Sequence, residues 1–297
     1  MREVGIVGLD TSHPAAFAEI LDDRDDVTIG GVWDDGTVRD DEHVDQFCAD
    51  TDAERFEDVE TMAESVDGAM VLTVDWETHV PLATAFLDAD VPTLVDKPLA
   101  ADLASLDRLE ASAEEAPLCG GSAVPFHPEL RALPCGGEDR TIFAAGYNDF
   151  YYYRVHLSDT LRRLADAPWA AVEPTDDPGT TLRVVFENGV HSWIRYDGTP
   201  DEGVFGVLDV TDSSTTAVEI RSGEDSFAAL YEPYIESFVH AIYGDRDDTA
   251  LLIDAAQLGL AVEAALDAGR RVTPDDDVLT ETKKDSSTFV GSYEPYY

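Results

Sequence analysis

The chain has 297 residues, of which 63 are acidic and 19 are basic, and its formal net charge at pH 7 is -44. Because 44% of the residues are apolar and recur in periodic blocks, the composition is that of a globular chain with an acidic surface and not of a disordered acidic polymer. A field of this sign repels phosphate, so we expect neither nucleic acid nor an anionic membrane as a partner.

The charge also indicates the working conditions. Self-repulsion of so many carboxylates destabilises a compact fold in dilute buffer, but at about 1 M salt the Debye length falls to roughly 3 Å and the repulsion is screened. We therefore expect a protein from a halophile that keeps concentrated salt inside the cell. The chain opens on a strand pattern and not on a signal peptide, and it has no apolar run of membrane-spanning length, so we expect it in the cytoplasm.

The first part of the chain alternates strand and helix patterns. The predicted strands are residues 4–9, 27–33, 68–74, 92–95 and 117–122. The predicted helices between them are residues 15–21, 59–65, 79–89 and 103–113. This alternation is typical of βαβ units, so residues 1–122 are predicted to form a doubly wound parallel sheet with helices on both faces.

The second part has an antiparallel pattern. The predicted strands 181–187 and 190–196 flank Asn188-Gly189, a pair that supplies the positive φ values of a type I′ hairpin turn. Strands 204–211 and 215–220 and helices 228–243 and 248–268 follow. The overall class is α/β, and residues 123–297 are predicted to form an α+β domain built on a mostly antiparallel sheet. From about Asp275 the tail is polar, and we expect it to be loosely held.

Cysteine usage predicts no metal site. Cys48, Cys119 and Cys135 are widely spaced and form no CxxC motif, so neither a zinc site nor a disulfide framework is expected. We predict that all three are buried thiols.

Lys97 is the only lysine among the first 282 residues. It follows an apolar strand in Val95-Asp96-Lys97-Pro98, at the carboxyl edge where open α/β sheets bind ligands. A guanidinium stays protonated, whereas the pKa of an ammonium moves with burial and the group can take part in proton transfer. We predict that Lys97 is functional; the alternative is a stem packed on apolar surface.

The first strand-to-helix turn reads GLDTSH over residues 8–13, where the GxGxxG fingerprint would cradle a pyrophosphate. Of the three glycines only Gly8 is present. Asp10 would repel phosphate unless it turns away to cap the helix, whereas Thr11 and Ser12 can donate to phosphate through hydroxyls and amides. A plain capped helix start fits the same residues.

Other residues at this edge can also meet a dinucleotide. Asp34, at the end of the second predicted strand, is placed to bind the ribose hydroxyls of NAD and to disfavour the extra phosphate of NADP, with Asp35 as its competitor. Thr73 and His79 bound the segment that leaves a later strand and enters a helix. His79 can equally be an ordinary helix N-terminal residue.

His156 and Asp159 are three residues apart at the predicted head of a helix that runs through Leu164, a spacing that puts both on one face. The histidine is a candidate general base or acid oriented by the carboxylate. A purely structural pair would have the same spacing. The aromatic run at residues 150–153 can stack on a sugar or pack in a core.

Together these segments resemble the Gfo/Idh/MocA family, named for glucose-fructose oxidoreductase, inositol dehydrogenase and MocA. The resemblance is carried by residues 4–8, 73–79, 95–100, 121–128, 154–164, 186–189 and 231–242, with Gly269 and Val272. Its most specific element is Asp96-Lys97-Pro98, for which the family form is Glu-Lys-Pro.

The resemblance implies hydride transfer between NAD, less readily NADP, and a hydroxyl-bearing carbon of a sugar, cyclitol or related polyol. It also implies that residues 1–122 are a Rossmann-type dinucleotide-binding domain and that residues 123–297 are a substrate-binding and oligomerisation domain with an open sheet. A homo-oligomer is implied to form through that C-terminal sheet. In the implied mechanism His156 accepts the hydroxyl proton and Lys97 holds the oxygen or shuttles its proton. The implied catalytic residues are Lys97, His156 and Tyr152. The implied cofactor-binding residues are Gly8, Asp10, Thr11, Ser12, Asp34, Thr73, His79 and Lys97. The implied substrate-binding residues are Lys97, Tyr152, His156 and Asp159.

The sequence departs from the family pattern in two places. Asp10 and His13 replace the second and third glycines, and Tyr152 stands four residues before His156, where the family usually has an aspartate. A tyrosine can donate a proton or a hydrogen bond but cannot act as a carboxylate. Two alternatives stay open: a non-catalytic ligand sensor or partner subunit on the same fold, and a redox-assisted lyase or hydrolase with tightly held NAD.

Overall fold

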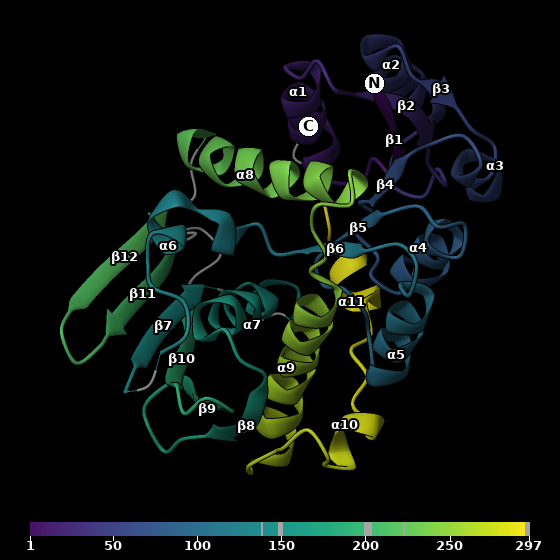
Figure 1. Cartoon of the computed structure of the whole chain (residues 1–297). Coiled ribbons are helices and arrows are strands. Elements are labelled where there is room, and N and C mark those ends of the chain that lie inside the picture. The colour runs from purple at the N-terminus through teal and green to yellow at the C-terminus, as the bar shows by residue number, and fades with distance from the viewer. Residues whose placement is uncertain (138, 148–150, 199–203, 222–223, 295–297) are drawn as a thin grey trace.

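Two six-stranded sheets organise the protein (Figure 1). The computed structural model describes residues 1–137, 139–147, 151–198, 204–221 and 224–294. The first sheet contains β1 (Arg2–Val7), β2 (Val27–Trp33), β3 (Glu54–Arg55), β4 (Gly68–Val71), β5 (Thr93–Asp96) and β6 (Leu118–Gly121). It is parallel, in the order β3-β2-β1-β4-β5-β6, which confirms the predicted doubly wound sheet.

Helices cover both faces of this sheet. They include α1 (His13–Asp22), α2 (Asp41–Thr51), α3 (Val59–Ala63), α4 (His79–Leu87) and α5 (Leu103–Ser112). Helix α2 was not predicted because its apolar pattern is weak: only Val44 and Cys48 are buried, and four of its eleven residues are acidic. The side chain of Asp40 caps it by accepting a hydrogen bond from the His43 amide.

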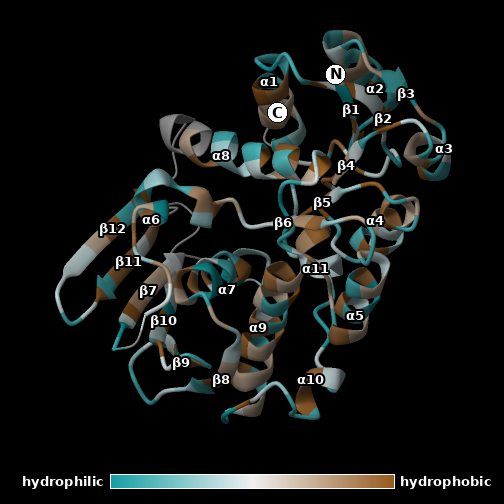
Figure 2. Ribbon diagram, viewed as in Figure 1, coloured by the Kyte–Doolittle hydropathy of each residue, from teal (hydrophilic) through white to brown (hydrophobic). Residues whose placement is uncertain are grey.

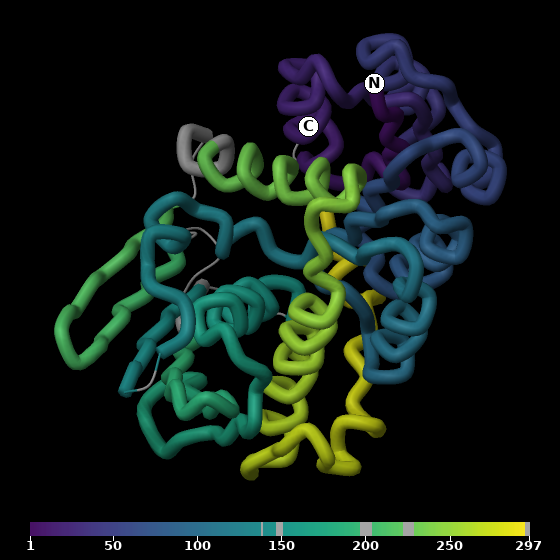
Figure 3. The backbone as a smooth tube through the Cα atoms, in the orientation of Figure 1, coloured from purple at the N-terminus to yellow at the C-terminus, as the bar shows by residue number. Residues whose placement is uncertain are grey.

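A helix from the second half completes one face of the first sheet. Phe238 and Ile242 of α8 (Glu224–Ile242) pack in the same core cluster as Phe17 of α1 and Ile6 of β1. The tube in Figure 3 shows α8 lying against α1. Gly68, the first residue of β4, lies at this contact. A larger residue does not fit there, because a Cβ would lie 2.7 Å from the Ile242 side chain.

The second sheet contains β7 (Thr141–Tyr147), β8 (Trp169–Pro174), β9 (Thr180–Phe186), β10 (His191–Gly198), β11 (Val204–Val210) and β12 (Thr215–Arg221). Its order is β12-β11-β7-β10-β9-β8, and each neighbouring pair is antiparallel except β7 with β10. The prediction of a mostly antiparallel sheet is thus confirmed. The β9–β10 hairpin is also present, but its turn differs from the prediction.

The turn between β9 and β10 is not of type I′. Of its residues only Gly189 has a positive φ, at 85°, and the Gly189 amide donates to the Phe186 carbonyl at 3.0 Å. This is the pattern of a three-residue hairpin loop with a glycine bulge. Asn188 is used differently, since its amide group donates to the Ala165 carbonyl at 2.7 Å.

Two helices cover one face of the second sheet: α7 (Tyr151–Ala165) and α9 (Thr249–Ala268). By length and composition α9 could cross a membrane, yet most of its apolar stretch is buried inside the protein. Figure 2 shows its largely hydrophobic colouring. The helix is better explained as a core element that joins the second sheet to α5 and β6.

The tail is held firmly against the first sheet, so the expectation of a loose tail was wrong. After α10 (Val278–Glu281) the Lys284 amide donates to the Ala101 carbonyl at 2.9 Å, and the Trp76 indole donates to the Lys284 carbonyl at 2.7 Å. The segment continues into α11 (Ser287–Val290). A second correction concerns Cys135, which is exposed, whereas Cys48 and Cys119 are buried as predicted.

Candidate active site

Lys97 lies directly after β5, and its side chain is buried at 6% exposure. Its ammonium nitrogen is 2.9 Å from the centre of the Tyr152 ring and 5.3 Å from that of Tyr153. Burial lowers the pKa of Lys97 to about 7, although the negative charge of Asp96 acts to raise it. Near neutral pH this amine therefore exchanges a proton readily, which an arginine in its place could not do.

His156 is half-buried on α7, in the second turn and not at the helix head as predicted. Its Nδ1 lies 2.7 Å from the Ser122 hydroxyl oxygen, which also accepts from the Val124 amide at 3.0 Å. Burial and the nearby charge of Lys97 hold the pKa of His156 well below its usual range. The imidazole is thus neutral at neutral pH and can accept a proton.

Ser122 was not predicted as a site residue. It follows β6, a different element from the helix that carries His156, and nothing local in the sequence marks it. When Nδ1 donates its proton to the Ser122 hydroxyl oxygen, Nε2 carries the free lone pair. This contact can therefore select the tautomer that a general base needs.

Asp159 does not orient His156, contrary to the prediction. Its carboxylate accepts from the Ser122 amide at 2.8 Å and from Nε of Arg163 at 3.0 Å. Both of its oxygens are engaged by these donors, and the residue is only 4% exposed. The prediction failed because Arg163, one turn further along α7, is the nearer partner. Asp159 instead fixes the loop after β6.

The first strand-to-helix turn keeps its glycine for a steric reason. Gly8 has a φ of 88°, and a Cβ there would lie 2.5 Å from the Thr73 side chain. The backbone N–H groups of Thr11 and Ser12 have no hydrogen-bond partner among the described residues. They lie at the N-terminus of α1, where amides are available to an anion.

Asp10 turns away from this helix end, but not to cap it. One carboxylate oxygen accepts from the Val74 amide at 2.8 Å, and the other is buried with no hydrogen-bond partner in the part of the chain that the structure describes. Burial raises the pKa of Asp10 to about 6, although the hydrogen bond from the Val74 amide acts to lower it. The position of Asp10 leaves the amides of Thr11 and Ser12 uncovered.

His13, in place of the third glycine, is joined to the end of β5. Its Nδ1 lies 2.7 Å from Asp96, and its ring stacks on Phe17 at 5.1 Å. Burial alone would raise the pKa of Asp96, but the charges of His13 and Lys97 lower it to about 2. This pair links the turn to the residue before Lys97.

Asp34 closes the same turn at the end of β2. It accepts from the amides of Leu9, at 2.7 Å, and Gly36, at 2.8 Å. A carboxylate has about four acceptor sites, so two remain for a ligand hydroxyl. Asp35, its predicted competitor, is exposed and bonded to the Thr37 amide.

His79 cannot contact a cofactor through its ring, so that prediction was wrong. The residue is fully buried, and its two ring nitrogens lie 2.8 Å from the Pro98 carbonyl and 2.9 Å from the Thr73 carbonyl. It ties the loop after β4 to the segment after Lys97. The Thr73 side chain is also buried. It packs against Gly8 and its hydroxyl bonds to that of Thr78, so it supports the turn from inside the protein.

These residues fit a bound dinucleotide. The amides of Thr11 and Ser12 at the N-terminus of α1 are available to a pyrophosphate, and Asp34 keeps acceptor sites for ribose hydroxyls. A metal centre finds no support, because the described residues include no group of three or more His, Cys, Asp or Glu side chains arranged to hold an ion.

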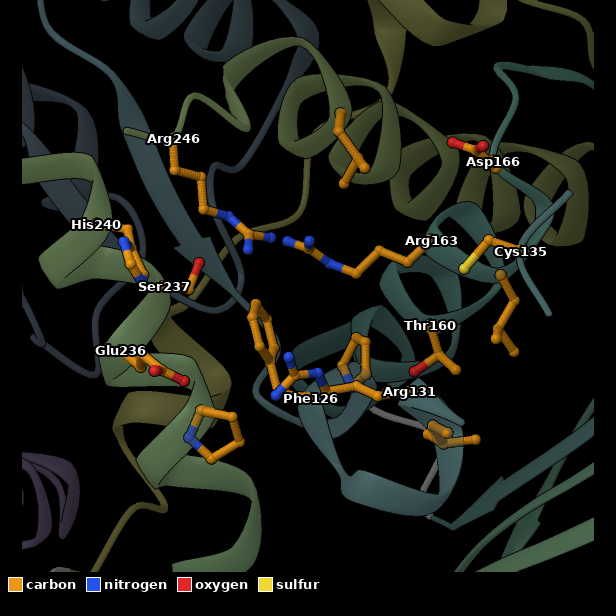
Figure 4. Close-up of a pocket in the computed structure, with 15 residues that line it drawn as sticks. Phe126, Arg131, Cys135, Thr160, Arg163, Asp166, Glu236, Ser237, His240 and Arg246 are labelled. Atoms are coloured by element: carbon orange, nitrogen blue, oxygen red, sulfur yellow. The ribbon is translucent and has the colours of Figure 1, made fainter. Parts of the chain in front are cut away.

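A separate cavity of about 510 Å³ lies between α7, α8 and the loop before α9 (Figure 4). Figure 4 shows the guanidinium groups of Arg163 and Arg246 pointing toward each other. Asp248 bonds to both, at 3.2 and 2.7 Å, so their charges are already paired. Neither Lys97 nor His156 lines this cavity, which therefore lies apart from the candidate active site.

Comparison with known proteins points to the same part of the chain, the parallel-sheet domain that leads to Lys97. Residues 2–120 match the family model described as an oxidoreductase family with an NAD-binding Rossmann fold. No protein with a curated description matches the chain by sequence.

Solved structures share the fold over nearly the whole chain. A probable dehydrogenase from Thermotoga maritima has a TM-score of 0.77 at 16% identity, covering 91% of this chain and 98% of its own. A myo-inositol dehydrogenase from Lactobacillus casei, solved with NAD(H) and myo-inositol, has a TM-score of 0.76 at 13% identity, covering 93% and 97%. A UDP-N-acetylglucosamine 3-dehydrogenase from Acidithiobacillus ferrooxidans has a TM-score of 0.70 at 17% identity, covering 90% and 98%.

Proposed function

Because the chain belongs, through its residues 2–120, to the Gfo/Idh/MocA oxidoreductase family with its NAD-binding Rossmann fold, we propose that it is a dehydrogenase that oxidises a hydroxyl-bearing carbon of a sugar, cyclitol or related polyol. The observation that carries the proposal is that the buried Lys97, directly after β5, lies within electrostatic range of His156, which is bonded to Ser122 directly after the neighbouring strand β6. Similar folds named as inositol and sugar-nucleotide dehydrogenases support this substrate class.

NAD, when bound, supplies the hydride acceptor. His156 accepts the proton of the substrate hydroxyl at Nε2, and Ser122 fixes the tautomer that makes this possible. The Lys97 ammonium donates a charge-assisted hydrogen bond to the oxygen as negative charge develops on it. Tyr152 holds the ammonium against its ring face and needs no carboxylate to do so.

NAD is the better fit than NADP. Asp34 presents a carboxylate where an additional ribose phosphate would lie, and a like charge disfavours that phosphate. A buried Arg39 stands close by, but its Nε donates to the Leu9 carbonyl, so it supports the turn.

A homo-oligomer formed through the second sheet is part of the proposal. Phe143 and Leu208 are 43% and 38% exposed, and both Trp193 and Leu208 lie directly opposite Phe143 in the neighbouring strands. This apolar row lies on the face that α7 and α9 leave open. The net charge of -44 supports a further part of the proposal, that the protein works in concentrated salt in the cytoplasm of a halophile.

The test is a fluorescence titration of NADH into the protein in concentrated potassium chloride, followed by a screen of polyols for NAD reduction. We expect NADH to bind and at least one cyclitol or sugar to reduce NAD, with Lys97→Met and His156→Ala each losing about 10²-fold or more in turnover. Failure to bind NADH at millimolar concentration would sink the proposal.

A non-catalytic ligand sensor on the same fold is the second candidate. The charged carboxylate of Asp10 beside the phosphate turn favours it, because that charge weakens dinucleotide binding. The polyol screen separates the two, since a sensor binds a polyol without reducing NAD. Redox-assisted elimination or hydrolysis would instead show turnover without net change in NADH absorbance.

A further inference from the structure

Residues 282–294, here called the C-terminal segment, reach the region of Lys97 through polar anchors. The Ser286 hydroxyl bonds to Asp75 at 2.6 Å and to Glu77 at 3.1 Å. Lys283 forms an ion pair with Glu77 at 2.8 Å, and Lys284 forms one with the buried Glu263 at 2.7 Å. These anchors fix where the aromatic residue of α11 lies.

That residue, Phe289, stacks on Tyr152. The two ring centres are 4.2 Å apart and the planes are inclined by 24°. Trp76 closes the cluster, with its ring centre 5.9 Å from that of Phe289. Tyr152 itself is only 6% exposed, so its ring is enclosed by this packing.

Phe289 and Lys97 lie on opposite faces of the Tyr152 ring. The Lys97 nitrogen is 2.9 Å from the ring centre, and a second ring stacked at 4.2 Å on the same face would overlap with it. The three side chains are therefore layered in the order ammonium, Tyr152, Phe289. Because Phe289 packs on its other face, the Tyr152 ring cannot move away from the ammonium, and water cannot enter behind the ring.

We propose that Phe289 is a positioning residue for Lys97: it acts through Tyr152 to hold the ammonium in place and to keep water away from it, which makes the C-terminal segment a working part of the site. The inference rests on the proposed function only in treating Lys97 as the reacting amine. The layered geometry holds whatever the substrate is.

Charged and titratable groups around Lys97 come from several elements. Asp96 precedes it in β5, His156 and the phenols of Tyr152 and Tyr153 face it from α7, and His13 of α1 acts through Asp96. Phe289 adds no charge of its own. Its replacement therefore changes the hydration of Lys97 without adding or removing an ionisable partner.

The test measures the proton affinity of Lys97 directly. The chain has three lysines, so lysine labelled with ¹³C at Cε gives a spectrum that Lys97→Arg assigns, and the full chain is titrated by NMR in concentrated potassium chloride. The wild-type midpoint is expected near 7. In Phe289→Ala water reaches the amine, and we expect the midpoint to rise by about one pH unit or more.

Phe289→Tyr keeps the stacked ring and is expected to restore the wild-type midpoint. Phe56→Ala, which removes another partly buried ring packed on the same core cluster, is the matched control and should leave the midpoint unchanged. An unchanged midpoint in a folded Phe289→Ala chain, checked by circular dichroism, would overturn the inference. If that variant does not fold, Phe289→Val, which removes the stacked ring and part of its volume, is judged by the same shift.

The readout needs neither substrate nor cofactor, so the two proposals fail separately. A shifted midpoint in a chain that reduces no NAD with any polyol would reject the dehydrogenase and keep Phe289 as a positioning residue. A chain that reduces NAD with a polyol, but whose Lys97 midpoint is unchanged in Phe289→Ala, would keep the dehydrogenase and reject Phe289 as a positioning residue.

Discussion

His13 Nδ1 lies 2.7 Å from Oδ2 of Asp96, so the residue that replaces the third glycine of the phosphate turn is bonded to the residue that precedes Lys97. The histidine that replaces the third glycine and the aspartate that replaces the glutamate of Glu-Lys-Pro therefore contact each other. The imidazole gives the buried Asp96 carboxylate a side-chain partner besides the Lys97 amide, which donates to Oδ1 at 2.8 Å.

His13→Gly, which restores the glycine, is expected to destabilise the protein. It leaves Asp96 buried without its partner, and breaking a buried pair in this way costs about 3–5 kcal/mol. The measurement is the free energy of unfolding in denaturant. Arg2→Ala, which breaks the exposed Arg2–Asp67 pair, is the control and should cost about 1 kcal/mol or less.

The same pair has a defined pH dependence. The pKa of Asp96 is about 2 in the folded protein and about 3.9 when unfolded, so its contribution is present above about pH 4 and is lost as the pH falls toward 2. His13→Gly should reduce this acid dependence. An equally steep loss of stability in the variant would contradict the assignment.

Asp10→Asn is expected to stabilise the protein at neutral pH. Because burial raises the folded-state pKa of Asp10 to about 6, the wild type loses stability as the pH rises from about 4 to about 6. The amide oxygen of asparagine can still accept from the Val74 amide, so we expect a gain of about 1–3 kcal/mol at pH 7 and none below about pH 4. Asp35→Asn, at the exposed neighbour, should show no such gain. A loss at pH 7 would mean that the unpaired oxygen needs its charge.

Lys97→Met is expected to stabilise the protein below about pH 7 while abolishing its activity. A lysine with a pKa of about 7 when folded and about 10.4 when unfolded costs stability below pH 7, and the cost disappears as the pH rises to about 10. The gain from Lys97→Met should therefore be about 4–5 kcal/mol near pH 6 and fade at high pH. Arg221→Met, which removes an exposed charge on the second sheet, should have a flat profile between pH 6 and pH 10. A less stable Lys97→Met at pH 6 would show that the amine is paired more strongly than its burial implies.

Ser122→Ala is expected to lower kcat by about 10–100-fold with little change in KM, because His156 loses the partner that selects its tautomer. Ser122→Thr keeps a hydroxyl and should retain most of the activity. The matched control is Ser192→Ala, since Ser192 is a fully buried serine whose hydroxyl has no hydrogen-bond partner among the described residues. Equal losses in both alanine variants would mean that the effect is structural.

Phe143→Asp is expected to dissociate the proposed oligomer, because it puts a charge in the centre of the apolar row on the second sheet. Light scattering in concentrated salt measures the mass of the particle. Tyr243→Asp changes an aromatic residue of almost equal exposure, 44% against 43%, that lies outside this sheet, and should leave the mass unchanged. A wild-type chain that is monomeric by the same measurement would reject the oligomer.

The fold was predictable because its signals are local. Alternating apolar runs and helix caps identified every strand of the first sheet except the two-residue β3, and four of its five helices. Lys97 was found by composition, since a lone lysine in an arginine-using chain stands out without any structural knowledge. Such signals do not depend on how the chain folds back on itself.

The parts that were missed depend on contacts between distant segments. Ser122 becomes a partner of His156 only when β6 meets α7, and Phe289 reaches Tyr152 only when the tail returns to the first sheet. For Asp159 a valid spacing argument failed because Arg163 competes for the same carboxylate. Helical spacing shows which residues share a face, but not which of several neighbours binds.

The covering of the first sheet by α8 has a consequence for synthesis on the ribosome. More than one hundred residues separate Gly121, where the sheet ends, from Phe238, which packs on it. At about 5–20 residues per second, the nascent sheet waits on the order of ten seconds with part of one apolar face bare. Concentrated salt strengthens hydrophobic association, so this interval, more than the finished fold, is where we expect the chain to depend on chaperones.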